Sequence, residues 1–156
     1  MSDFWGDFKP EIIKTPNKIL KEISEDLSKI TNNFVYADIQ QFDKESKNMY
    51  FNPDDFYEFN FAFIIKSKYM DNYSFKVFSI HHDIIPYPIY IKIDSAIKDT
   101  IITEIKDFKK EELEGDIIAE SEDEFKSLIK IILQSKKLRE IINVIYSISK
   151  QYEDIF

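Results

Sequence analysis

The stretch YEFNFAFIIK, residues 57 to 66, decides the fold class. Apolar side chains occupy every second position: Tyr57, Phe59, Phe61, Phe63 and Ile65. Polar residues alternate with them, namely Glu58, Asn60 and Lys66. Because successive side chains of a strand point to opposite faces, this period of two predicts a β-strand with one face in the core and one polar face.

The same β-branched and aromatic character extends from residue 34 to residue 93. We expect strands near residues 34 to 42, 56 to 67, 73 to 82 and 88 to 93, and a short one at residues 116 to 120. Turn-forming residues separate them at Asn52-Pro53-Asp54-Asp55 and at Met70-Asp71-Asn72. Since the connections are short, an antiparallel meander is the simplest arrangement.

Helix signals lie on both sides of these strands. Thr15-Pro16 offers a capping hydroxyl followed by proline at the first helical position, and Asn32-Asn33 ends the apolar stripe that follows. Residues 95 to 113 favour a helix over a strand. Ser121 and Glu124 have the spacing of a capping box, in which the glutamate reaches back to the cap, and Ser135 restarts the helical pattern.

The chain of 156 residues fits one domain, residues 1 to 156. The predicted fold class is α+β: an antiparallel sheet of four to five strands packed against an N-terminal helix and two C-terminal helices. The absence of cysteine fits a reducing compartment, and no apolar run approaches the roughly 18 residues of a membrane span. We therefore expect a cytoplasmic protein. Gly6 and Gly115 are its only glycines, which excludes glycine-rich nucleotide loops, and we predict no cofactor.

Both histidines stand in the sequence HHDIIPYPIYIKI, residues 81 to 93. Neighbouring residues on a strand face opposite sides, so His81 and His82 are poorly placed to bind one metal ion together. We interpret them as structural. The alternative is a metal-dependent hydrolase that uses His81, His82 and Asp83.

Pro86-Tyr87-Pro88 suits a bend or a sheet edge, because each proline removes a ladder donor. Tyr87-Pro88 is the candidate for a cis peptide bond. The functional alternative is an exposed loop that a partner grips.

An acidic run follows, with eight acids in fourteen residues and no basic residue among them: Glu111, Glu112, Glu114, Asp116, Glu120, Glu122, Asp123 and Glu124. The chain has 29 acids and 21 bases, so the remaining 21 acids balance the bases and the net charge of −8 resides in this segment. Part of the run favours the N-terminus of the following helix. A patch of one sign also serves to steer and hold a partner of opposite charge.

The stretches TPNKILKEISEDL (15 to 27), HHDIIPYPIYI (81 to 91) and SEDEFKSLIKIILQSKKLREII (121 to 142) cover roughly a third of the chain. In this order they resemble small acidic bacterial proteins of unknown activity, of the kind found as partners in toxin immunity and phage defence. The resemblance implies a bacterial or phage cytoplasmic α+β protein and transfers no functional residue.

The sequence thus favours a non-enzymatic protein-binding module, an immunity protein or inhibitor that neutralises a basic partner through the acidic run. A DNA-mimicking phage inhibitor is the alternative. Direct binding of nucleic acid is not expected, because the net charge is negative and Arg139 is the only arginine.

Overall fold

The computed structural model describes residues 3–42, 57–110 and 116–155. These residues form a five-stranded antiparallel sheet with the strand order β1-β2-β3-β4-β5. The strands are β1 (Val35–Gln41), β2 (Phe59–Ser67), β3 (Ser74–His82), β4 (Ile89–Ile93) and β5 (Ile117–Ala119). The predicted meander and its short fifth strand are confirmed. Of the two predicted turns, residues 52 to 55 lie outside the described residues, whereas the Tyr73 amide closes the other by donating to the Met70 carbonyl at 2.8 Å.

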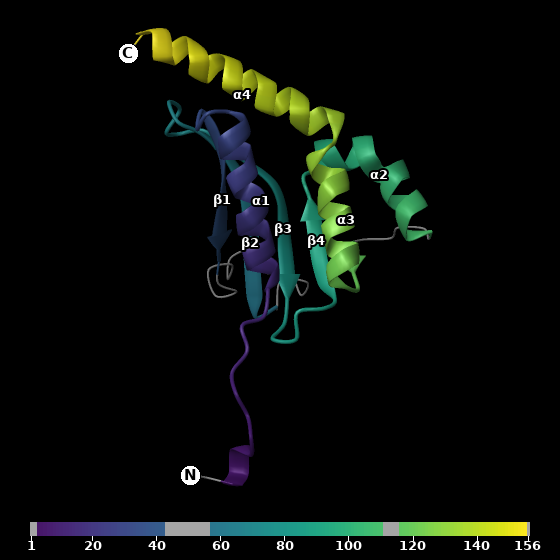
Figure 1. The fold of residues 1–156 in the computed structure, drawn as a ribbon. Helices are drawn as coiled ribbons and strands as arrows, with labels where there is room; N and C mark the ends of the chain where they lie inside the picture. The colour runs from purple at the N-terminus through teal and green to yellow at the C-terminus, as the bar shows by residue number, and fades with distance from the viewer. Residues whose placement is uncertain (1–2, 43–56, 111–115, 156) are drawn as a thin grey trace, which may run out of the picture.

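The helices are α1 (Pro16–Ile30), α2 (Ser95–Lys109), α3 (Glu122–Leu133) and α4 (Lys136–Ile155), and a short 3-10 helix η1 (Asp3–Trp5) precedes them. Figure 1 shows α1 and α3 in front of the sheet with strands visible between them, α2 beyond α3, and α4 across the upper end. The α+β class, with one N-terminal and two C-terminal helices on an antiparallel sheet, is as predicted. The helix at residues 95 to 109 confirms the helical interpretation of that segment.

The helix ends follow the signals in the sequence. Thr15 caps α1 by accepting from the Lys18 amide, and Pro16 is the first helical residue. Asn32 and Asn33 end it with positive φ angles of 51° and 67°, which asparagine tolerates better than most residues. Ser121 caps α3 by accepting from the Glu124 amide. The second half of the expected capping box is wrong, because the Glu124 carboxylate binds the Lys109 ammonium of α2.

One hydrophobic core lies between the sheet and the helices. We call the sheet face that bears Phe61, Phe63 and Ile65 the core face; Phe78 and Ile80 of β3 share it by register. The helices cover it with these buried side chains: Ile19, Leu20, Ile97, Ile101, Ile105, Phe125, Leu128, Ile129, Ile132, Leu138 and Ile145. The alternation in the sequence of β2 therefore corresponds to two faces of the sheet, one of which lies in the core.

Tyr57 is an exception to that alternation. Its ring stacks on Tyr90 and contacts His81, and both of these residues lie on the other face, which we call the outer face. The assignment of Tyr57 to the same face as Phe59 is wrong, because β2 begins only at Phe59 and the chain bends at Glu58.

The N-terminal segment, residues 3–14, leaves the body beside the start of α1 (Figure 1). Its large apolar side chains are exposed: Phe4, Trp5, Phe8, Ile12 and Ile13. No helix within the described ranges is long and apolar enough to cross a membrane.

Candidate functional site

The two histidines of β3 lie on opposite faces of the sheet, as expected for neighbouring strand residues. His81 is on the outer face, opposite Asn60 in the β2–β3 register. His82 is on the core face, where its ring stacks on Phe59 and Phe61 at centroid distances of 5.3 and 6.2 Å. Both side chains are buried.

His81 belongs to a buried hydrogen-bonded chain. Its Nε2 lies 2.9 Å from Ser79 Oγ, and its Nδ1 lies 2.7 Å from Asn60 Oδ1. The Asn60 amide nitrogen donates to the Tyr57 carbonyl at 2.9 Å, and a carbonyl can only accept. Asn60 therefore presents its oxygen to His81, so Nδ1 carries the proton and Ser79 donates to Nε2.

This order of groups matches that of a serine nucleophile, a histidine base and an orienting amide. The surroundings differ from those of such a site. Ser79 is 4% exposed and stands in a strand paired on both sides, so the backbone amides of β3 are engaged in the ladder rather than directed at a reacting carbonyl. The chain of bonds satisfies three buried polar side chains on the outer face, and we interpret it as structural.

His82 has one hydrogen-bonded and one free ring nitrogen. Its Nδ1 donates to the Asp83 carbonyl at 2.8 Å, which leaves Nε2 as an acceptor in the neutral ring. Nε2 is buried and has no partner in the described part of the chain. Burial lowers the pKa of His82 below its ordinary value, and the Asp83 carbonyl and carboxylate oppose that shift.

The alternative metal site of His81, His82 and Asp83 is not assembled. His81 points away from the other two residues, and both its ring nitrogens have partners. The Asp83 carboxylate accepts from the Glu58 amide at 3.4 Å. Within residues 3–42, 57–110 and 116–155, no group of three or more histidine and carboxylate side chains could hold a metal ion.

The lowered pKa of His82 predicts a pH-dependent stability. Between the folded pKa and the ordinary value of 6.5, the unfolded chain binds more protons than the folded chain, so stability falls as the pH falls through this window. Urea unfolding of the wild type and of His82→Phe, each at about pH 7.5 and about pH 5.5, measures this contribution. We expect the wild type to lose more stability on acidification than the variant. Equal losses of stability in the two proteins would show that folding does not favour the neutral form of His82.

The acidic run lies only in part within the described residues. Glu111, Glu112 and Glu114 lie outside them, so their placement is not tested. Asp116 precedes β5, Glu120 follows it, and Glu122, Asp123 and Glu124 form the first turn of α3, where acids stabilise the helix dipole.

Two of these five acids have lysine partners. Glu124 pairs with the largely buried ammonium of Lys109, which also donates to the Ile118 carbonyl at 2.7 Å. Glu122 lies 3.3 Å from Lys126, one turn along α3. Asp116, Glu120 and Asp123 have no ion-pair partner among the residues whose structure is described.

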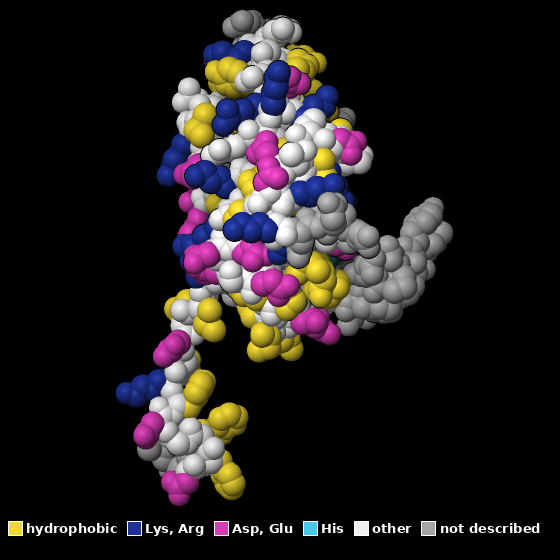
Figure 2. Space-filling model, turned by 90° about the vertical axis from the view of Figure 1, so that its right-hand side faces the viewer, with side chains coloured by type: hydrophobic (Ala, Val, Ile, Leu, Met, Phe, Trp, Pro, Cys, Tyr) yellow, Lys and Arg dark blue, Asp and Glu magenta, His cyan; other side chains and the backbone are white. Residues whose placement is uncertain are grey.

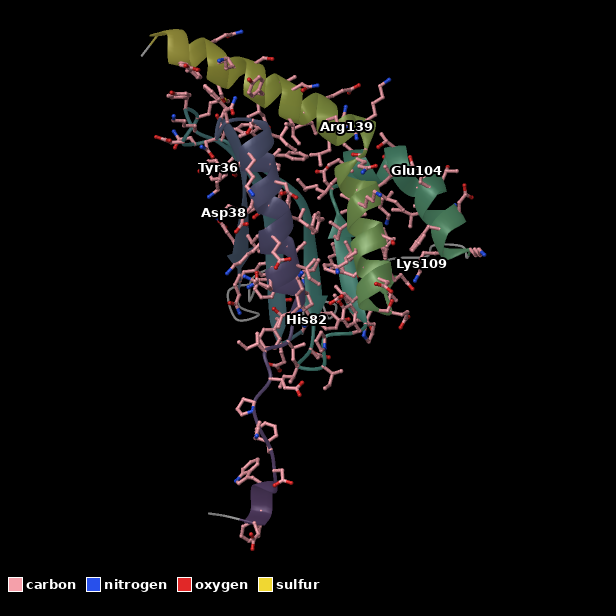
Figure 3. All side chains as sticks on the ribbon, in the orientation of Figure 1. Tyr36, Asp38, His82, Glu104, Lys109 and Arg139 are labelled. Atoms are coloured by element: carbon pink, nitrogen blue, oxygen red, sulfur yellow. The ribbon has the colours of Figure 1, made fainter. Side chains whose placement is uncertain are left out.

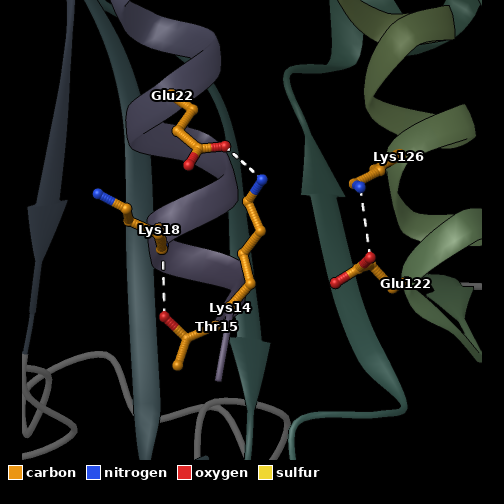
Figure 4. A network of polar contacts seen from close by, with 6 residues as sticks. All are labelled: Lys14, Thr15, Lys18, Glu22, Glu122 and Lys126. Atoms are coloured by element: carbon orange, nitrogen blue, oxygen red, sulfur yellow. Dashed lines mark hydrogen bonds and ion pairs between the residues drawn. The ribbon is translucent and has the colours of Figure 1, made fainter. Parts of the chain in front are cut away.

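A further ion pair lies at α1. Figure 4 shows Lys14 against Glu22 of α1, facing the Glu122–Lys126 pair of α3. The hydrogen bond between Lys14 and Glu22, 2.6 Å long, raises the pKa of the lysine and lowers that of the glutamate. The pairs on α1 and α3 are close enough for long-range attraction between them, since Lys126 lowers the pKa of Glu22 and Glu122 raises that of Lys14.

The five acids of the run that the structure describes do not form one continuous patch. Between Asp116 and Glu120 runs β5, whose Ile117 and Ala119 are buried. Four residues of extended chain separate the two carboxylate-bearing residues by about 13 Å. Glu120, Glu122, Asp123 and Glu124 therefore form one group, and Asp116 belongs with the other end of β5.

The group at α3 lies beside the loop between β3 and β4, residues 83–88. Ala119 is opposite Ile89 in the β4–β5 register, which places Glu120 next to the end of this loop. The charges of Glu122 and Asp123 also reach Tyr87, whose pKa is raised to about 12, mainly by burial of its hydroxyl group. The Tyr87-Pro88 bond is cis, as the sequence suggested.

The loop exposes two large apolar side chains, because Ile84 is 75% exposed and Ile85 is 76% exposed. Figure 1 shows the loop at the lower end of the sheet, where α1 and α3 begin, and Figure 2 shows hydrophobic side chains there bordered by acidic ones. We call the surface formed by Ile84, Ile85, Glu120, Glu122 and Asp123 the lower end. In the sequence nothing marks the two isoleucines as a surface feature except their position beside the prolines.

In comparisons with protein-family models, with curated proteins and with solved structures, the chain matches none.

Proposed function

We propose that the protein is a non-enzymatic binding module that holds a basic protein partner at its lower end. The observation that carries the proposal is the adjacency of two exposed isoleucines to acids at the start of α3. Interfaces combine an apolar centre that excludes water with a polar rim, and charges at the rim select and steer the partner. The lower end offers both parts within one loop and one helix turn.

The charge of the chain supports a basic partner. The whole net charge of −8 derives from the segment that ends at this helix turn. Glu120 and Asp123, which have no lysine partner in the described ranges, are available to cations from outside. Nucleic-acid-binding effectors and nuclease toxins have basic surfaces because they hold phosphates, which makes them the class of partner that such a surface fits.

The role that we propose on this basis is that of an immunity protein or inhibitor, which neutralises its partner by covering a basic surface; the bacterial cytoplasm is the setting that the resemblance of the sequence implies. The exposed apolar side chains of residues 3–14 begin at the same end and extend the apolar area available to a partner. The alternative is that the protein mimics DNA. A mimic occupies the DNA-binding groove of its partner, so it must compete with DNA for that partner. A partner that binds DNA and this protein at the same time would exclude mimicry.

The apolar part of the lower end is tested by Ile85→Ser. We expect affinity for a partner purified from the source cell to fall about fivefold, equivalent to about 1 kcal/mol, because the apolar contact is lost. Ile30→Ser is the matched control, since Ile30 is 79% exposed at the opposite end of α1. Isothermal titration of the three proteins gives the comparison. Equal affinities of Ile85→Ser and the wild type would contradict a binding role for this loop.

A further inference from the structure

A cavity of about 340 Å³ opens beside the first turn of α1, between that helix, the start of β2 and the end of β3. Its apolar walls are Phe59, Phe61, Ile84 and Pro86. Figure 3 shows His82, which lines it, at the lower end of the sheet. The cavity lies on the core face, so it is separate from the Ser79–His81–Asn60 chain on the outer face.

Two of the residues that line this cavity carry a buried acceptor without a hydrogen-bond partner in the described residues: Nε2 of His82 and Oδ1 of Asn17. His82 is only 5% exposed, and its Nδ1 donates to the Asp83 carbonyl, so Nε2 presents a lone pair. A buried acceptor without a donor costs about 1 to 3 kcal/mol. A molecule that brings a donor into the cavity recovers this free energy.

The residues that line the cavity favour an uncharged, largely apolar ligand. None of the eight described residues that line the cavity is an acid, a lysine or an arginine, so an ionic ligand would lose its hydration without gaining a counter-charge from them. The phenylalanine rings and Pro86 offer flat apolar surface, and the volume is at the small end of ligand sites, which range over roughly 300 to 1,000 Å³.

We propose that this cavity binds a small, uncharged, largely planar molecule that donates an N–H or O–H hydrogen bond to His82 Nε2. The aromatic and proline walls hold the plane of the molecule, and Asn17 Oδ1 accepts a second donor if the molecule has one. We do not propose a metal site here, because the described residues that line the cavity include one histidine and no carboxylate.

Two probes of nearly equal shape test the proposal on the intact chain. Indole has a ring N–H, and 1-methylindole has a methyl group in its place. We expect NMR titration to give a dissociation constant near 1 mM for indole and about tenfold weaker binding for 1-methylindole, the factor that corresponds to one hydrogen bond of about 1.4 kcal/mol. The affected amides should include those of Phe61, His82 and Ile84. Phenol and anisole form a second pair, with the same order expected.

Variants assign the preference to His82. In His82→Phe the ring is retained and the acceptor removed, so indole and 1-methylindole should bind equally. In Asn17→Leu the order of the probes should persist, and Asn143→Leu, at an exposed position of α4, should match the wild type. Equal binding of the two probes to the wild type, shifts confined to other parts of the chain, or no saturable binding would overturn the proposal. The last result would mean that water alone satisfies Nε2.

Discussion

Phe63→Ala is expected to lower the free energy of unfolding by about 3 to 5 kcal/mol, the usual cost of removing a buried phenylalanine. Phe63 is 2% exposed in the middle of β2, and its ring stacks on Phe78 of β3 with the centroids 4.9 Å apart and the planes 12° apart. Truncation to alanine removes this aromatic pair and leaves a cavity under the helices. Because a domain is stable by only about 5 to 15 kcal/mol, this is a large part of the total.

The measurement is urea unfolding followed by circular dichroism, with Phe8→Ala as the control. Phe8 is 69% exposed in the N-terminal segment, so its truncation should change stability by less than about 0.5 kcal/mol. A loss of similar size in both variants, or none in Phe63→Ala, would contradict the placement of the core on this face of the sheet.

The sequence predicts those parts of the fold that depend only on residues close to one another in the chain. The alternation in β2 and the caps at Thr15 and Ser121 are properties of a few adjacent residues, and the structure agrees with them. The predicted positions of Tyr57 and Glu124 are wrong because the alternation ends at the bend at Glu58 and because Glu124 has a partner far away in the sequence. Beyond the bend, the Tyr57 ring packs against Tyr90 and His81 on the outer face. The Glu124 carboxylate binds the Lys109 ammonium of another helix instead of the backbone at the start of α3.

Less of the candidate site could be predicted from the sequence, because its surface depends on contacts between distant residues. Alternation along a strand placed His81 and His82 on opposite faces, and this is confirmed. Sequence cannot show that Ile84 and Ile85 stay exposed, because apolar residues next to a strand are ordinarily buried by the rest of the fold. Nor can a charge count show that β5 divides the acidic run, since the division depends on how Ile117 and Ala119 enter the core.

Charge reversal at the lower end is expected to have the largest effect on binding. In the variant Glu120→Lys/Asp123→Lys, two acids without described ion-pair partners become cations that repel a basic partner. We expect the affinity to fall about 30-fold at low salt, equivalent to about 2 kcal/mol, with most of the loss in the association rate. The loss should shrink as salt screens the charges.

The matched control is Asp99→Lys/Glu104→Lys, which changes the net charge by the same amount at exposed positions of α2. Figure 3 shows Glu104 far from His82 and the lower end. The control separates a local effect of the lower end from a general effect of net charge.

The affinity of the purified partner for these two variants, measured side by side at low salt, tests the proposed function most directly. The account predicts a loss of about 30-fold for Glu120→Lys/Asp123→Lys and a change within about twofold for Asp99→Lys/Glu104→Lys. Equal affinities of the two variants would contradict binding at the lower end.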